Sequence, residues 1–130
     1  MTELPPGLAA FARGEADPSA FPHREHVRMG YEMLRRHDFA QTAHLYSRAL
    51  RSMAARAGKP EAFHQTVTLA FLSLIAERMP DAEDSAGDFA GFANANPDLF
   101  EKTVLARWYR PGWLASDAAR RTFLLPEPWR

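Results

Sequence analysis

The sequence contains no cysteine, and this excludes disulfides, thiolate metal sites, iron–sulfur clusters and cysteine nucleophiles. A metal ion would therefore have to rely on His, Asp or Glu side chains. The sequence also lacks a glycine-rich dinucleotide loop, a phosphate-binding loop, a serine nucleophile elbow and the HExxH zinc motif. None of these motifs therefore identifies a catalytic residue.

Long apolar runs are missing as well. The chain nowhere has the roughly 18 consecutive apolar residues that a membrane-spanning helix needs, and residues 1–20 lack the basic start and apolar run of a secretory signal. Asp plus Glu equals Lys plus Arg at 16 each, and the basic residues are scattered, which argues against nucleic acid or a membrane as a partner. We expect a cytoplasmic protein.

The composition is that of an ordinary globular domain, with 46% apolar and 25% charged residues in a chain of 130. Apolar residues recur at helical spacing, and no segment of useful length alternates as a β-strand would. We therefore predict an all-α fold, a compact single-domain bundle of about four to six helices. Residues 1–20 are expected to form an N-terminal arm and residues 21–130 the helical domain.

The helix boundaries follow from capping residues, prolines and glycines. Asp38 is placed to cap one helix, Gly58 to end it, and Pro60 to begin the next. Short connections between the first three helices predict antiparallel neighbours. The expected helices are a short turn around 8–13, then 22–36, 39–57, 60–79, a weak helix containing Phe89 and Phe92, 97–108 and 117–123.

Two histidines stand three residues apart at the start of the second expected helix. His23 and His26 would project from neighbouring positions on one helix face. His23 is in line with Val27 and Gly30, and His26 with Gly30 and Met33, which are expected on the core side. Two imidazoles in this position could share one ion.

A third histidine lies in the expected helix 60–79. His64 precedes Val67 and Phe71 by one and two turns, so it should also face inward. If the two helices pack together, His23, His26 and His64 could converge as a three-nitrogen site for a divalent metal ion, Zn, Fe, Cu or Ni, with an open position. Two carboxylates are candidates for a fourth ligand or a general base: Glu25 and Glu61.

Two other interpretations of these residues stay open. In one, His64, Thr66 and Thr68 form a metal-free, hydrogen-bonded pocket for a small polar metabolite. Its ligand-binding residues would be Thr68 together with three aromatic side chains that close it: Tyr31, Trp108 and Tyr109. In the other, the histidines are structural and only satisfy nearby backbone groups.

Three segments together resemble a widespread group of small, uncharacterised helical bacterial proteins. They are 21–26 (Phe-x-His-x-x-His), 64–68 (His-x-Thr-x-Thr) and 109–120 (Tyr-x-Pro-x-x-Leu-x-Ser-x-x-Ala-Arg). The resemblance covers most of the chain after residue 20 and implies a shared fold and a shared pocket, but no established activity. Gln65 stands where Glu is expected in many relatives, so its side chain is a poor candidate for an indispensable ligand or base.

A different class of function is the main alternative. The last third of the chain is rich in large aromatic residues: Trp108, Tyr109, Trp113 and Trp129. If these are exposed, the protein would be a non-catalytic interaction or scaffold module, acting as a homodimer or as a subunit of a larger complex.

Overall fold

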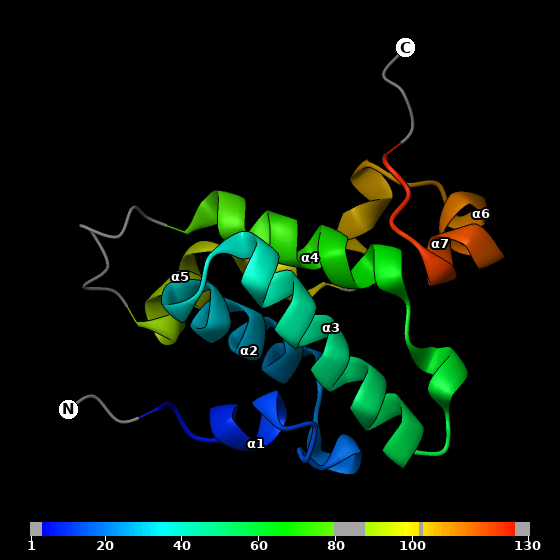
Figure 1. Ribbon diagram of the computed structural model, residues 1–130. Coiled ribbons are helices and arrows are strands. Elements are labelled where there is room, and N and C mark those ends of the chain that lie inside the picture. Colours follow the sequence, from blue (N-terminus) through cyan, green and yellow to red (C-terminus); the bar gives the residue numbers. More distant parts are fainter. Residues whose placement is uncertain (1–3, 80–87, 102, 127–130) are drawn as a thin grey trace.

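The computed structural model describes residues 4–79, 88–101 and 103–126, and within these residues the fold is all-α, without a β-strand. Three long helices form its centre: α2 (His23–Arg36), α3 (Phe39–Arg56) and α4 (Gln65–Arg78). Each of them packs against the other two (Figure 1). The predicted fold class is confirmed.

Shorter helices surround this centre. The α-helices among them are α1 (Leu8–Ala12), α5 (Phe89–Ala95), α6 (Pro111–Leu114) and α7 (Asp117–Arg121). The 3-10 helices are η1 (Pro18–Ala20), η2 (Pro60–Ala62), η4 (Pro97–Phe100) and η5 (Val104–Arg107). Helices α6 and α7 lie beside the N-terminal end of α4 (Figure 1), and α7 packs against it.

The boundaries of α3 agree with the prediction from local signals. The Asp38 carboxylate accepts a hydrogen bond from the Gln41 amide at 2.7 Å, so it caps the helix as expected. Gly58 follows the helix end with a φ of 75°, a left-handed conformation that suits glycine. Ser116 caps α7 in the same way as Asp38 caps α3, through the Ala119 amide.

Two predicted helices are divided. The expected helix 60–79 is split into η2 and α4, because Phe63 is extended and His64 becomes the N-cap of α4. The expected helix 97–108 is instead the two 3-10 helices η4 and η5. On one straight helix Leu99 and Val104 would point about 140° apart, whereas the interrupted chain buries both.

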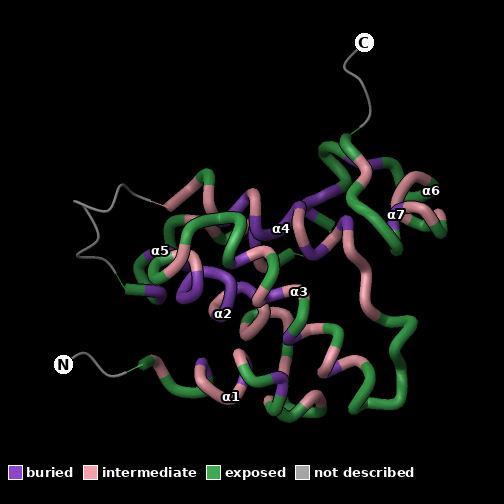
Figure 2. The backbone as a smooth tube through the Cα atoms, viewed as in Figure 1, coloured by how far each residue is buried: buried purple, intermediate pink, exposed green. Residues whose placement is uncertain are grey.

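The core consists of two apolar clusters, and α2 and α4 contribute to both of them. The first cluster includes Val27, Phe71 and Leu99, and the second includes Phe11 of α1. Buried residues recur along α2, α3 and α4 (Figure 2). Phe11 is fully buried, so part of the segment expected as an N-terminal arm belongs to the core.

Close packing between α2 and α4 depends on a small residue. A Cβ atom placed on Gly30 would lie 3.1 Å from side-chain carbons of Leu72 and of Ile75, closer than ordinary van der Waals contact. Glycine therefore lets the two helices approach each other closely at this point.

Candidate functional site

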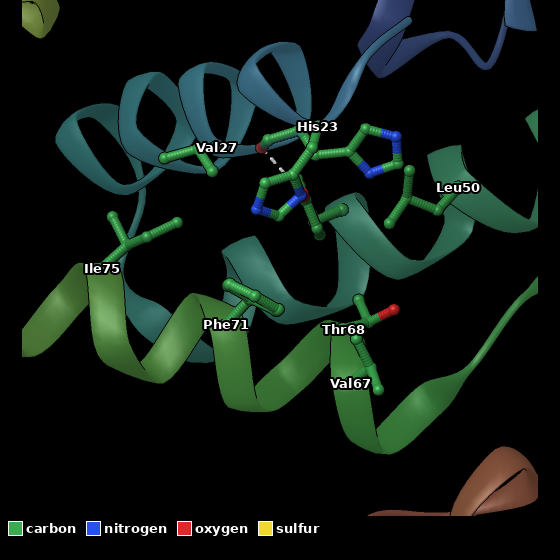
Figure 3. A pocket seen from close by; sticks show the side chains of 9 residues that line it. His23, Val27, Leu50, Val67, Thr68, Phe71 and Ile75 are labelled. Carbon is green, nitrogen blue, oxygen red and sulfur yellow. Dashed lines mark hydrogen bonds between the residues drawn. The ribbon is translucent and has the colours of Figure 1, made fainter. Parts of the chain in front are cut away.

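Two adjoining pockets open between α2, α3 and α4, and Figure 3 shows the first of them. The first has a volume of about 260 Å³ and the second about 280 Å³. Both are lined by His26, Leu50, Val67 and Thr68, so they adjoin, and we call the two together the groove. The first pocket is also lined by His23, Val27, Tyr46, Phe71 and Ile75.

The first turn of α2 brings two of the predicted histidines to the groove. The His23 and His26 rings have centroids 6.3 Å apart. His23 Nε2 lies 2.9 Å from the Leu99 carbonyl oxygen of η4, and because a carbonyl only accepts, this nitrogen must carry the proton. The His26 ring packs edge-on against Phe21. The spacing of the Phe-x-His-x-x-His segment thus places both imidazoles at one site.

His64 reaches the groove in a different role from the one its sequence position suggested. It is the N-cap of α4, and its Nδ1 accepts a hydrogen bond from the Val67 amide at 3.1 Å. Its Nε2 donates to the Leu114 carbonyl at 2.7 Å. Both ring nitrogens are therefore used, and a metal ion could bind His64 only by displacing one of these hydrogen bonds.

The three-histidine metal site accordingly has no support in this arrangement. No group of three or more His, Asp or Glu side chains is placed to hold a metal ion in the part of the chain that the structure describes. The two carboxylates considered as additional ligands are also engaged elsewhere or exposed. Glu25 accepts two hydrogen bonds from Arg28, each 2.7 Å long, which lower the pKa of its carboxyl group, and Glu61 is exposed.

The two threonines of the His-x-Thr-x-Thr segment have separate functions. Thr66 is fully buried, and its hydroxyl donates to the Thr122 carbonyl at 2.8 Å and accepts from the Leu124 amide at 3.0 Å. The Thr68 hydroxyl donates to the His64 carbonyl at 2.7 Å and lines the groove. Only the second threonine is available to a ligand.

The segment 109–124 contains the partners of His64 and Thr66. The Tyr109 hydroxyl donates to the Leu124 carbonyl at 2.8 Å, and Arg120 donates to the Glu61 carbonyl at 2.8 Å. Ala119 of α7 is fully buried. We call this set of contacts between 61–66 and 109–124 the C-terminal joint. It gives a structural reason for the Tyr-x-Pro-x-x-Leu-x-Ser-x-x-Ala-Arg segment.

The remaining predicted ligand-binding residues lie away from the groove. Tyr31 is buried in the core, with ring centroids 5.6 Å from Phe89 and 4.8 Å from Phe92. Trp108 and Tyr109 line a third pocket, of about 190 Å³, on another face of α4. The structure therefore brings Thr68 together with His23 and His26, but not with the three aromatic residues that were expected to close the pocket.

Sequence reasoning missed two walls of the groove, both on α3. Leu50 is half-buried between the two pockets, and Tyr46 is buried with its hydroxyl 2.8 Å from the His26 carbonyl. Burial raises the pKa of the Tyr46 hydroxyl, which keeps it protonated. In the sequence both residues belong to the apolar stripe of α3, and this pattern is the same for a pocket wall as for a core face.

The groove has no formal charge of its own. In the described ranges no Asp, Glu, Lys or Arg side chain lines either pocket.

Among the described residues, no helix has the length and apolarity needed to cross a membrane. No protein-family model, curated protein or solved structure matches the chain, and the resemblance to uncharacterised helical proteins stays a prediction.

Proposed function

We propose that the protein binds a small molecule with an apolar body and a polar group in the groove between α2, α3 and α4. The observation that supports this proposal is the mostly apolar first pocket, which is lined by His23, His26 and Thr68 and adjoins the second. Small-molecule sites typically combine apolar walls with a few convergent polar side chains. Each of the two pockets approaches the size of the smallest typical ligand sites, which is on the order of 300 Å³.

The contrast with the surrounding core also supports this function. Protein interiors are close-packed and contain few voids larger than a water molecule. Val27 and Phe71 pack closely in the first core cluster, yet each also lines the groove. These two side chains therefore belong to the packed core on one side and line the open groove on the other.

Filling the groove tests this proposal. Leu50 lines both pockets, so Leu50→Phe should occupy the space of a ligand, while Ala55→Phe adds an aromatic ring to the same helix at an exposed position. The wild-type protein should show NMR shift changes at groove residues when it is titrated with toluene or p-cresol. These changes should be lost in Leu50→Phe and kept in Ala55→Phe. Equal changes in all three proteins, or none in the wild type, would contradict the proposal.

A second candidate function is supported by exposed apolar residues near the C-terminal end of the described chain. Trp108 is 38% exposed, Phe123 39% and Leu125 72%, and the first two of these line the third pocket. Such a patch is typical of a protein interface. Tyr109, however, is buried, Trp113 is half-buried, and Trp129 lies outside the described residues.

Oligomeric state tests this second function. If the patch joins two copies, light scattering should give the mass of a dimer for the wild type and that of a monomer for Trp108→Glu. Ser73→Glu, which adds the same charge to another residue of the third pocket, should also weaken the dimer. A wild-type protein that is monomeric at all concentrations would contradict the homodimer.

A further inference from the structure

Most polar side chains that line the groove donate their hydrogen bonds within the protein. Five described polar side chains line the two pockets, and four of them donate to backbone carbonyls of the protein itself. These four bonds are His23 Nε2 to Leu99 O, Tyr46 Oη to His26 O, His64 Nε2 to Leu114 O, and Thr68 Oγ1 to His64 O, with lengths between 2.7 and 2.9 Å.

What remains for a ligand on His23, Tyr46 and Thr68 is a set of acceptors. A neutral imidazole has one N–H, so the donation by His23 Nε2 leaves a lone pair on Nδ1. The hydroxyl oxygens of Tyr46 and Thr68 keep lone pairs after donating their single hydrogen. His64 Nδ1 already accepts from the Val67 amide. The unused hydrogen-bonding capacity of His23, Tyr46 and Thr68 therefore consists of acceptors.

His26 is the fifth polar side chain of the groove, and its ring contacts the rings of Phe21 and His23. The acceptors considered for a ligand belong to the other side chains, His23, Tyr46 and Thr68.

The absence of charge restricts the ligand further. An ammonium group would enter the groove without a carboxylate to balance its charge, because no Asp or Glu of the described chain lines the pockets. A carboxylate would face lone pairs of His23 and Thr68, and no Lys or Arg of that part of the chain would pair with it. A neutral group with a hydrogen to donate fits both conditions.

We propose that the ligand of this groove is a neutral alcohol or phenol that donates its hydroxyl hydrogen to the acceptors left on His23, Tyr46 and Thr68. This inference rests on the proposed function, since it names the chemical class of the small molecule. The apolar walls formed by Val27 and Phe71 would hold its hydrocarbon part.

Three molecules with the same methylphenyl body separate the possibilities: p-cresol, toluene and 4-methylbenzoate. They are titrated into the full chain at about pH 8, where ordinary imidazoles are neutral, and binding is followed by NMR shifts of groove residues. One added hydrogen bond corresponds to about five-fold in affinity. We therefore expect p-cresol to bind at least about five-fold more tightly than toluene, and 4-methylbenzoate to bind most weakly.

The outcomes distinguish this inference from the proposed function. If toluene binds as tightly as p-cresol, or if 4-methylbenzoate binds most tightly, the donor-ligand inference is overturned while a small-molecule groove remains. If none of the three molecules shifts any groove residue, both fail.

A variant locates the acceptor. Thr68→Val should bring the p-cresol to toluene affinity ratio towards one, while Thr103→Val, at an exposed position, should leave it unchanged. Circular dichroism establishes that both variants are folded. A folded Thr68→Val protein with an unchanged ratio would remove Thr68 from the acceptors, and the ligand series on the wild type remains decisive if this variant does not fold.

Discussion

The groove and the C-terminal joint use the same residue types, histidine and threonine, at opposite sides of the first turn of α4. In the joint, Thr66 uses both its donor and its acceptor on backbone groups of Thr122 and Leu124. His64 donates to the Leu114 carbonyl and accepts from the Val67 amide of its own helix. In the groove, His23 and Thr68 donate to nearby carbonyls but keep lone pairs beside an open hollow. The two regions therefore differ in whether the hydrogen-bonding capacity of these side chains is used within the protein, and not in the types of residue they contain.

The geometry of one helix turn explains how two such different regions lie so close together. Thr66 and Thr68 are two residues apart, so their side chains point about 200° apart around α4. Thr66 therefore faces the tail and Thr68 faces α2 and α3. Changes on the two sides should have separable effects, large on stability for the joint and large on binding for the groove.

The largest effect on stability is expected at Thr66. Thr66→Val keeps the shape of the side chain but leaves the Thr122 carbonyl and the Leu124 amide without their partner. Losing two partly buried hydrogen bonds should lower the free energy of unfolding by about 3 kcal/mol, measured by chemical denaturation. Thr122→Val is the control, because the Thr122 side chain is exposed. If the two variants were equally stable, the joint would not contribute as described.

A smaller loss of stability is expected at His64, where the variant also tests the metal hypothesis. His64→Ala removes the N-cap of α4 and the bond to Leu114, and should cost about 2 kcal/mol. His64→Asn can restore the cap and should recover part of this loss. Elemental analysis by mass spectrometry of protein purified without an affinity tag should show the same metal content before and after substitution. Near-stoichiometric Zn, Fe, Cu or Ni that disappears in His64→Ala would support the three-histidine site instead.

Local signals made much of the fold predictable. The bounds of α2 and α3 depend on residues such as Pro22, Asp38 and Gly58, which act within a few positions of the helix end. The site was predictable for a similar reason, because His23 and His26 are three residues apart on one helix. The spacing alone therefore predicted that His23 and His26 lie at one place.

The joint could not be predicted because its partners are distant in the sequence. His64 and Leu114 are 50 residues apart, and Thr66 and Leu124 are 58 apart. His64 was expected on a helix face because its hydrogen bond to Leu114, which helps to hold it in the cap position, joins residues so far apart in the sequence. Leu50 and Tyr46 were missed because an apolar helical stripe does not show whether the opposite surface is filled or open.

The smallest effect is expected at an ion pair between α4 and η4, next to the residue that binds His23. Asp98 of η4 forms a two-point pair with Arg78 of α4, with distances of 2.6 and 2.9 Å. The next residue, Leu99, supplies the carbonyl that binds His23. Asp98→Asn should therefore reduce stability by only about 1 kcal/mol, and should leave the joint intact because its contacts lie at the other end of α4.

The stability that this ion pair contributes should change with pH in a defined direction. The hydrogen bond from Arg78 lowers the pKa of the Asp98 carboxyl in the folded protein, so folding is favoured when this group is ionised. The contribution is complete above the ordinary pKa of aspartate and is lost as the pH falls through the lowered value. The difference in unfolding free energy between wild type and Asp98→Asn should therefore shrink in acid, while the difference for Thr66→Val should not follow this titration. A difference for Asp98→Asn that stays constant into acid would show that the ionised Asp98 carboxylate does not supply this stability.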